Sequence, residues 1–437
     1  MEKYQFKAGA GSAAIVFSQE MFPTDHLYGV HADPALRLIV LDAGERAAIV
    51  SAEMVNISGE LLDDIRRVVA EKTQTPFDNV WMHVTHAITT PHAPGGPFFG
   101  KKPPEGKRPG PPQGPPPDPD APMKNKIYTE AVLKATNEAA AQAADIKPAR
   151  YGFVKGTTNV NINRDFDSGF GWWVKQNPDE YSNKEMPVLK IEDTDGKLIG
   201  VLVSADLKPC CIDQSGREDG TALVDPDVPG YACKACEKEL GAPVMFCMAA
   251  AGDQVTREQS FWEDVDEQGN AFKVDEGVEK GFELVEKLGK EMAGEISAAV
   301  SETKCDISET AVVLARGSVT YQKRKDSRRQ KNPVKEIAYE ADGEAELGIM
   351  AIALGDELAF AAVKPEVNSC TGRSLKERSP FDVTILMSMV NGGMKYMPDK
   401  LSYDRCTWEA GSTSCMPGTA EIWTDGAVKL LNGLKEK

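Results

Sequence analysis

The sequence predicts an α/β fold in which mixed β-sheets are flanked by helices. Short apolar runs at 36–42 and 47–53 are followed by a helical pattern at 58–72 and a further apolar run at 79–86. Strands that alternate with amphipathic helices are typical of α/β domains. The chain has 437 residues and no internal repeat, and we expect residues 1–437 to form a single domain with a deep core.

Each element rests on its own pattern. Between 58 and 72 the apolar residues fall on one helical face, and Ser58 is a candidate N-cap. The turn at Asp195-Gly196 separates two runs that we expect to pair as strands. In the rest of the chain these patterns predict helices at 127–145, 229–240, 275–303, near 380–390 and near 425–435, and strands at 187–193, 198–206, 243–250, 310–320, 345–353 and 357–363.

A proline-rich segment interrupts this pattern after the apolar run at 79–86. Residues 91–122 contain 13 of the 28 prolines, which excludes a helix or an interior strand there. One interpretation is a solvated spacer of polyproline type. The other is a loop or lid at 93–122, because the segment follows a histidine-rich strand end.

Charge and composition limit the partners. The chain has 50 Lys+Arg and 67 Asp+Glu, a formal net charge of −17, which argues against nucleic acid because phosphate binding needs a basic surface. No apolar run approaches the length of a membrane span, and the N-terminus lacks the pattern of a signal peptide. Nine cysteines, an odd number, suggest free thiols in a cytoplasmic protein. We expect a small-molecule substrate, and a homo-oligomer is compatible with the sequence.

Histidines are concentrated before residue 93, and His86 is the strongest functional candidate among them. It ends the apolar run 79–86 and is followed by a loop rich in Gly and Pro, an arrangement that can direct an imidazole into a cleft. The alternative for His86 is a core histidine bonded to a carbonyl, and this alternative is stronger for His83. His92 lies within the loop, where it could simply be solvated.

Four later segments also combine groups that are typical of binding sites. Arg164 is surrounded by Asn and Asp and could hold a carboxylate or an oxyanion, or could pin its own loop. Asp253 follows a strand end, where ligands often bind in α/β sheets, or is only a turn residue. Glu366 follows a proline beyond an apolar strand. The run 389–413 is dense in Tyr, Trp, Asn and Gly, and its candidates are Tyr396, Tyr403 and Trp408.

Taken in order, these segments resemble the catalytic domain of the neutral/alkaline (non-lysosomal) ceramidase family. The resemblance extends from about residue 7 to about 415 and depends on seven short motifs in register rather than on a single decisive one. They include AGAGSAAIVF, NVWMHVTH, NVNINRDF, the VDPDVPGYA helix start, MAAAGDQ, KPEVNSCTGRSL and NGGMKYMPDKLSYDRCTWEAGST.

The resemblance implies a zinc amidase that cleaves an N-acyl bond. It implies that His86, Glu366 and Tyr396 bind the metal, and that Arg164 holds the substrate or an oxyanion. Trp408 stands where the family has a second tyrosine. A secreted family member would also carry an export signal and a C-terminal β-sandwich, and we expect neither here.

The chain departs from the family pattern at several positions. The family's His-Thr-His triplet reads His86-Ala87-Ile88, and Lys208 stands where the second metal-binding histidine is expected. A protonated lysine cannot ligate a metal and repels a dication. Val255 replaces the serine that acts near the Gly-Asp turn.

Three functions therefore remain open at this point. The first is a metal-dependent amidohydrolase for a small polar N-acyl or lactam substrate, with zinc or another divalent metal on His86, Glu366 and Tyr396 and with Asp206 or His92 as a further ligand. The second is a metal-free isomerase, epimerase or lyase for a small sugar or hydroxy-acid, in which Lys208 works with Glu366. The third is a binding homologue without turnover.

Overall fold

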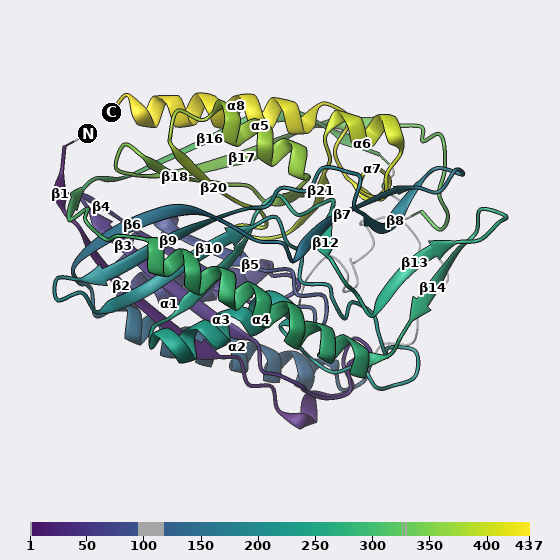
Figure 1. Cartoon of the computed structure of the whole chain (residues 1–437), viewed down its shortest axis with the longest axis horizontal. Coiled ribbons are helices and arrows are strands. Elements are labelled where there is room, and N and C mark those ends of the chain that lie inside the picture. Colours follow the sequence, from purple (N-terminus) through teal and green to yellow (C-terminus); the bar gives the residue numbers. More distant parts are fainter. Residues whose placement is uncertain (1, 95–117, 326, 328–329) are drawn as a thin grey trace, which may run out of the picture.

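The computed structural model describes residues 2–94, 118–325, 327 and 330–437 as four stacked layers (Figure 1). Two β-sheets pack face to face, and helices cover both outer faces. One core lies between the sheets and includes Ile39 and Trp81 from the first sheet and Phe360 from the second. The other two cores lie between each sheet and its own helices.

The larger sheet has eight strands in the order β11-β10-β9-β6-β2-β3-β4-β5, mostly antiparallel, with parallel pairs at both edges. Its helices bury amphipathic faces against it. The strands are β2 (Lys7–Ala14), β3 (Ala35–Ala43), β4 (Glu45–Ala52), β5 (Val80–Val84), β6 (Lys147–Thr157), β9 (Glu185–Asp193), β10 (Leu198–Ala205) and β11 (Val244–Met248), and the helices are α1 (Gly59–Thr73), α2 (Ala121–Ala143), α3 (Asp227–Leu240) and α4 (Val278–Glu302).

The smaller sheet has four strands in the order β16-β17-β18-β20, and two helices cover its outer face. Trp423 of the last helix is fully buried there, and its Nε1 donates to Gly348 O at 3.3 Å. The strands are β16 (Val312–Arg324), β17 (Ala341–Leu354), β18 (Leu358–Ala362) and β20 (Val383–Met387), and the helices are α5 (Ser369–Arg378) and α8 (Thr419–Lys435).

Short elements gather at one end of the layers, on the right in Figure 1. They form a three-stranded sheet in the order β12-β7-β8, the hairpin β13–β14 and the parallel pair β19–β21. Their bounds are β7 (Asn161–Asp167), β8 (Trp172–Asn177), β12 (Gln254–Thr256), β13 (Phe261–Val265), β14 (Ala271–Asp275), β19 (Pro365–Val367), β21 (Met394–Met397), α6 (Lys400–Arg405) and α7 (Trp408–Ser412); at the opposite end β1 (Tyr4–Gln5) pairs with β15 (Glu309–Thr310).

The glycines of the first strand allow a helix to pack closely on the sheet. A Cβ added at Gly9 or Gly11 would lie 2.1 Å from a carbonyl oxygen of α2, at Ala143 and Ala139 respectively. Real Cβ atoms do not approach backbone oxygens so closely, so the glycines fix the distance between α2 and β2.

The two edge strands of the larger sheet are joined through His83. Met248 N on β11 donates to His83 Nε2 at 3.1 Å, and Ser51 Oγ on β4 donates to Phe246 O on β11 at 2.7 Å. Because Nε2 accepts, Nδ1 carries the proton and donates to Ser51 Oγ at 2.9 Å. Burial lowers the pKa of His83 to about 3, so the imidazole is neutral, and it is the core histidine that the sequence suggested.

Most predicted elements are present within a few residues of the predicted bounds. The expected helix near 380–390 is wrong: Val383–Met387 is strand β20, and the helix α5 precedes it. This run is short, fully buried and partly β-branched, and a buried strand and a buried helix segment cannot be distinguished by periodicity alone. The loop or lid expected at 93–122 lies mostly outside the described residues, which resume at 118.

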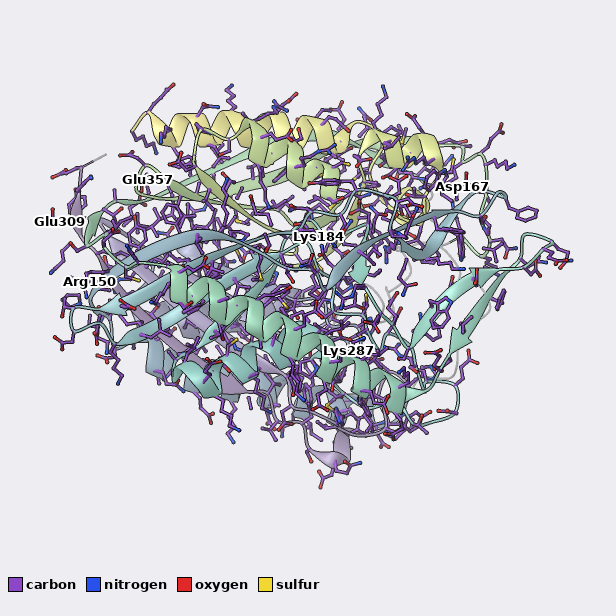
Figure 2. The ribbon with its side chains drawn as sticks, viewed as in Figure 1. Arg150, Asp167, Lys184, Lys287, Glu309 and Glu357 are labelled. Carbon is purple, nitrogen blue, oxygen red and sulfur yellow. The ribbon has the colours of Figure 1, made fainter. Side chains whose placement is uncertain are left out.

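Charged side chains lie on the outer faces of this fold. Figure 2 labels Asp167, Lys287 and Glu309, which are exposed on three different elements. In the described part of the chain, no helix is both long enough and apolar enough to cross a membrane. All nine cysteines are free thiols, as the sequence suggested.

Candidate functional site

A cavity of about 940 Å³ lies among the short elements at the end of the sheets. Loops that follow β5 and β10 form part of its lining, and β8, β13 and β21 form another part. Six of the eight residues that the sequence singled out as site candidates line this cavity: His86, Arg164, Lys208, Glu366, Tyr396 and Trp408.

His86 lies two residues beyond β5 in a left-handed backbone conformation, with φ of 61°. This conformation is uncommon for a residue with a Cβ, and such residues cluster at functional sites. The imidazole Nδ1 contacts Glu366 Oε1. Burial and the nearby Lys208 lower the pKa of His86 well below its ordinary value, so the ring is neutral.

Lys208 follows β10 and is buried at the centre of the site. Its Nζ lies 2.7 Å from Glu366 Oε2 and donates to Tyr396 Oη at 3.1 Å. Desolvation, followed by the charge of Arg164, lowers the pKa of Lys208 to about 7. The Glu366 carboxylate, 2.7 Å away, favours the charged amine and opposes this shift.

The parallel pairing of β19 with β21 places Glu366 directly beside Tyr396 in the strand register. Both Glu366 oxygens are buried, yet no described residue donates a hydrogen bond of normal geometry to either of them. A buried carboxylate without hydrogen bonds is costly. The positive charge of Lys208 is therefore the main compensation for the charge of Glu366.

Arg164 on β7 links this centre to a group of buried acids. Its Nε donates to Glu409 Oε1 at 3.0 Å, and its Nη2 donates to Tyr396 Oη at 3.2 Å. Glu409 on α7 keeps the pKa of the guanidinium well above its usual range despite burial. Burial and Glu409 raise the pKa of the adjacent Asp165 well above its ordinary value.

The donors His86, Glu366 and Tyr396 that the resemblance assigns to a metal do converge, but the set does not fit a dication. The Lys208 ammonium lies between Glu366 and Tyr396, and Arg164 adds a second positive charge. Arg164 is paired with Glu409, but the Lys208 ammonium lies against Glu366 and repels a divalent ion there. In the described parts of the chain no group of three or more His, Cys, Asp or Glu side chains could hold a metal.

Two of the eight candidates lie outside the cavity lining. Asp253 accepts hydrogen bonds from Ser369 N at 2.8 Å and from Ser369 Oγ at 2.7 Å, and burial raises its pKa to about 7. Tyr403 donates to Cys415 O at 2.8 Å and packs edge-on against Tyr339. Both have complete structural partners, and a catalytic role for them stays a prediction.

Of the secondary candidates, too, some line the cavity and others lie away from it. His92 lines the cavity and faces Asp25, with 3.2 Å between Nδ1 and Oδ2. Asp206 accepts from Asn183 Nδ2 at 3.1 Å and from Ala250 N at 3.2 Å, away from the cavity. Val255, in place of the family's serine, is buried at the cavity wall, and Trp408 packs edge-on against Trp173.

Sequence reasoning missed several charged residues of the site, among them Asp213, Arg217 and Glu409. Asp213 and Arg217 line the cavity from a loop after β10, and Glu409 holds Arg164. The loop has no periodic or motif signal that separates these residues from ordinary surface charges. Glu409 adjoins Trp408 in a segment that the sequence singled out, but only the fold pairs it with Arg164, 245 positions earlier.

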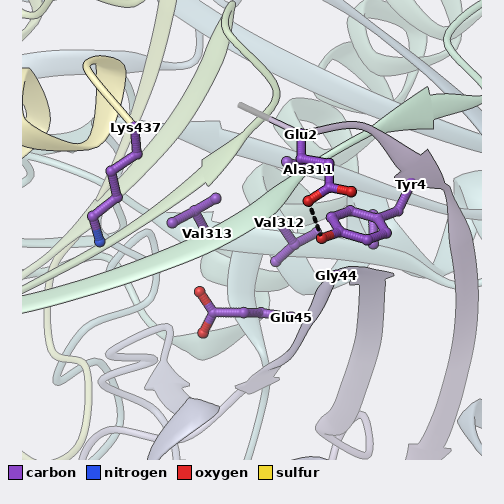
Figure 3. A pocket seen from close by; sticks show the side chains of 9 residues that line it. Glu2, Tyr4, Gly44, Glu45, Ala311, Val312, Val313 and Lys437 are labelled. Carbon is purple, nitrogen blue, oxygen red and sulfur yellow. Dashed lines mark hydrogen bonds between the residues drawn. The ribbon is translucent and has the colours of Figure 1, made fainter.

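A second, smaller cavity of about 330 Å³ lies where the two chain ends approach β4 and β16 (Figure 3). Tyr4 donates to Glu2 Oε2 at 2.9 Å there, and Glu45 and Lys437 also line it. This cavity combines apolar β16 residues with side chains of the two termini, and it contains none of the predicted site residues.

Comparison with known proteins supports the fold. The structure is similar to neutral ceramidase from Pseudomonas aeruginosa, with a TM-score of 0.68, 14% identity, and coverage of 99% of this chain and 75% of that one. A ceramidase complexed with C2 gives a TM-score of 0.67 and 15% identity, with coverage of 99% and 76%. No protein-family model and no curated protein sequence matches the chain. The chain therefore has the mixed α/β fold of the neutral ceramidases.

Proposed function

We propose that the chain is a metal-free enzyme that moves a proton at a carbon next to the carbonyl of a small polar substrate. The observation that carries this proposal is the buried Lys208 Nζ, which lies 2.7 Å from Glu366 Oε2 within the cavity. An amine whose pKa lies near 7 can both accept and return a proton at neutral pH.

In this mechanism Lys208 in its neutral form takes the proton from carbon, and Glu366 lies close enough to exchange it. Negative charge then develops on the carbonyl oxygen of the substrate. Arg164 Nη2 and Tyr396 Oη, 3.2 Å apart, can donate to that oxygen. Return of the proton to another position or face gives an isomerase or epimerase, and loss of a neighbouring group gives a lyase. Small sugars and hydroxy-acids are suitable substrates.

The test is exchange of substrate hydrogen for deuterium, followed by NMR in D₂O over a panel of aldoses, ketoses and hydroxy-acids. We expect exchange with the natural chain and its loss in Lys208→Met. The matched control is Lys190→Met, which removes a half-buried lysine paired with Glu192 at 2.8 Å on β9. Exchange that survives in Lys208→Met would contradict the mechanism.

A second candidate is hydrolysis of a small N-acyl or lactam substrate, and the shared fold with ceramidases favours it. Here neutral Lys208 would accept a proton from the attacking water, and Arg164 would hold the oxyanion. Amine release without deuterium exchange at carbon would identify this reaction. Thermal unfolding measured with the same panel tests the third alternative. A ligand that raises the melting temperature without either reaction indicates a binding homologue.

A further inference from the structure

We infer that the Lys208 ammonium fills the position that a metal ion would take in this site. We infer also that the single substitution Lys208→His would allow zinc to bind there. The inference concerns what the donor set holds, so it does not depend on which reaction the cavity supports. Wild-type protein is expected to bind no zinc there, because Lys208 already occupies the centre.

The geometry points to this role for Lys208. Glu366 Oε2 and Tyr396 Oη lie 2.7 and 3.1 Å from Lys208 Nζ, and His86 Nδ1 contacts the other oxygen of Glu366. A carboxylate and a phenol oxygen therefore lie beside a single positive charge, and an imidazole nitrogen lies against the far side of that carboxylate. Nitrogen and oxygen donors of this kind also suit zinc.

The missing hydrogen bonds of this group are a second observation. His86 Nδ1 and both Glu366 oxygens are buried, and within the described residues none of them takes part in a hydrogen bond of normal geometry. Buried polar atoms normally have such partners. Here His86 Nδ1 contacts one Glu366 oxygen and the Lys208 ammonium lies against the other, so the carboxylate is compensated by a cation rather than by hydrogen bonds.

Histidine is the substitution that the space allows. Its imidazole is shorter than the lysine side chain, so an ion can take the place that the ammonium group now fills. Removing the ammonium also removes one of the two positive charges that repel a dication, since Arg164 stays paired with Glu409. His86, Glu366, Tyr396 and the new histidine would give about four protein ligands, which suits zinc.

The experiment measures bound metal rather than turnover. Untagged wild type, Lys208→His and the matched control Lys175→His are treated with a chelator, loaded with zinc, dialysed and analysed by elemental mass spectrometry. Lys175 also lines the cavity but pairs with Asp264 at 2.7 Å, away from the three donors. We expect about one zinc per chain in Lys208→His alone, and its loss when His86→Ala is added.

Two results would overturn the inference. One is a wild-type chain that holds stoichiometric zinc and loses it on His86→Ala, because the site would then accept a metal beside Lys208. The other is a folded Lys208→His protein, judged by its circular dichroism, that takes up no zinc. If this variant does not fold, Lys208→Ala replaces it: three donors and an open position suffice for zinc, so uptake supports the inference and its absence refutes it.

Discussion

Two buried ion clusters in this chain differ in how completely their carboxylates are hydrogen-bonded. Arg37 on β3 pairs with Glu53 and Glu237, and all four carboxylate oxygens accept hydrogen bonds, including 2.7 Å from Ala35 N and 2.7 Å from Arg37 Nε. Glu366 beside Lys208 accepts none of normal geometry from the described residues.

The two clusters also differ in what surrounds them. The Arg37 cluster lies between the larger sheet and α3, against fully buried Cys233. The Lys208 cluster borders a cavity large enough for a small molecule. A complete hydrogen-bond network specifies one structure, whereas an incomplete one that faces a cavity leaves groups available for chemistry. This difference, rather than burial or charge, separates the structural cluster from the candidate site.

The largest effect is expected from a substitution that breaks the Lys208 cluster. Lys208→Met removes the proposed base, and we expect turnover in the deuterium-exchange assay to fall about a hundred- to ten-thousand-fold. The free energy of unfolding should also fall, by about 3 kcal/mol, because Glu366 loses the cation that compensates its buried charge, but the chain should still fold. A variant that loses its folded structure as well as its activity would place Lys208 with Arg37 as a structural cation.

The next largest effect is expected from a substitution that breaks the Arg37 cluster. Glu53→Gln leaves Arg37 underpaired and turns an amide donor towards either Arg37 or Ala35 N, so we expect the free energy of unfolding to fall by about 3 kcal/mol. Urea denaturation measures this loss, with exposed Glu60→Gln as the control. Equal stability of the two variants would contradict the structural role of the cluster.

A smaller effect concerns pH. Because the pKa of Lys208 is lowered to about 7, the neutral amine needed as a base increases as pH rises from 6 to 8. The rate of deuterium exchange should therefore fall about tenfold per unit below the pKa and level off above it. Rates measured from pH 5.5 to 9 give the profile. A rate that declines with rising pH through this range would require the protonated amine instead.

The smallest effect concerns the cavity wall. Trp408→Leu removes an edge-to-face contact with Trp173, whose ring centroids are 5.6 Å apart, and we expect a loss of about 1 kcal/mol in the free energy of unfolding. If Trp408 only shapes the cavity, KM should rise more than kcat falls. A loss confined to kcat would instead place Trp408 beside the reacting atoms.

Periodicity predicted most of the fold, since strands such as β3 and β10 are continuous apolar runs between clear turns. It failed at β20, where the buried run Val383–Met387 is too short for its period to decide between helix and strand. The convergence of His86, Lys208 and Glu366 was expected through the resemblance, not from spacing. Glu409 could not be paired with Arg164 in advance, because the pairing depends on how α7 packs against β21 and β8.

The hydrogen bonds of His83 between the two edge strands make the stability of the protein depend on acid pH. His83 has a pKa of about 3 in the folded chain and an ordinary value near 6.5, so between these limits only the unfolded chain binds the proton. Stability then falls with acid by about 1.4 kcal/mol per pH unit from this residue alone. Urea midpoints at pH 7 and pH 5 test the slope. The imidazole that connects β5 to β11 at neutral pH therefore destabilises the protein in acid. It lies three residues before His86, so the loss of stability begins next to the candidate site.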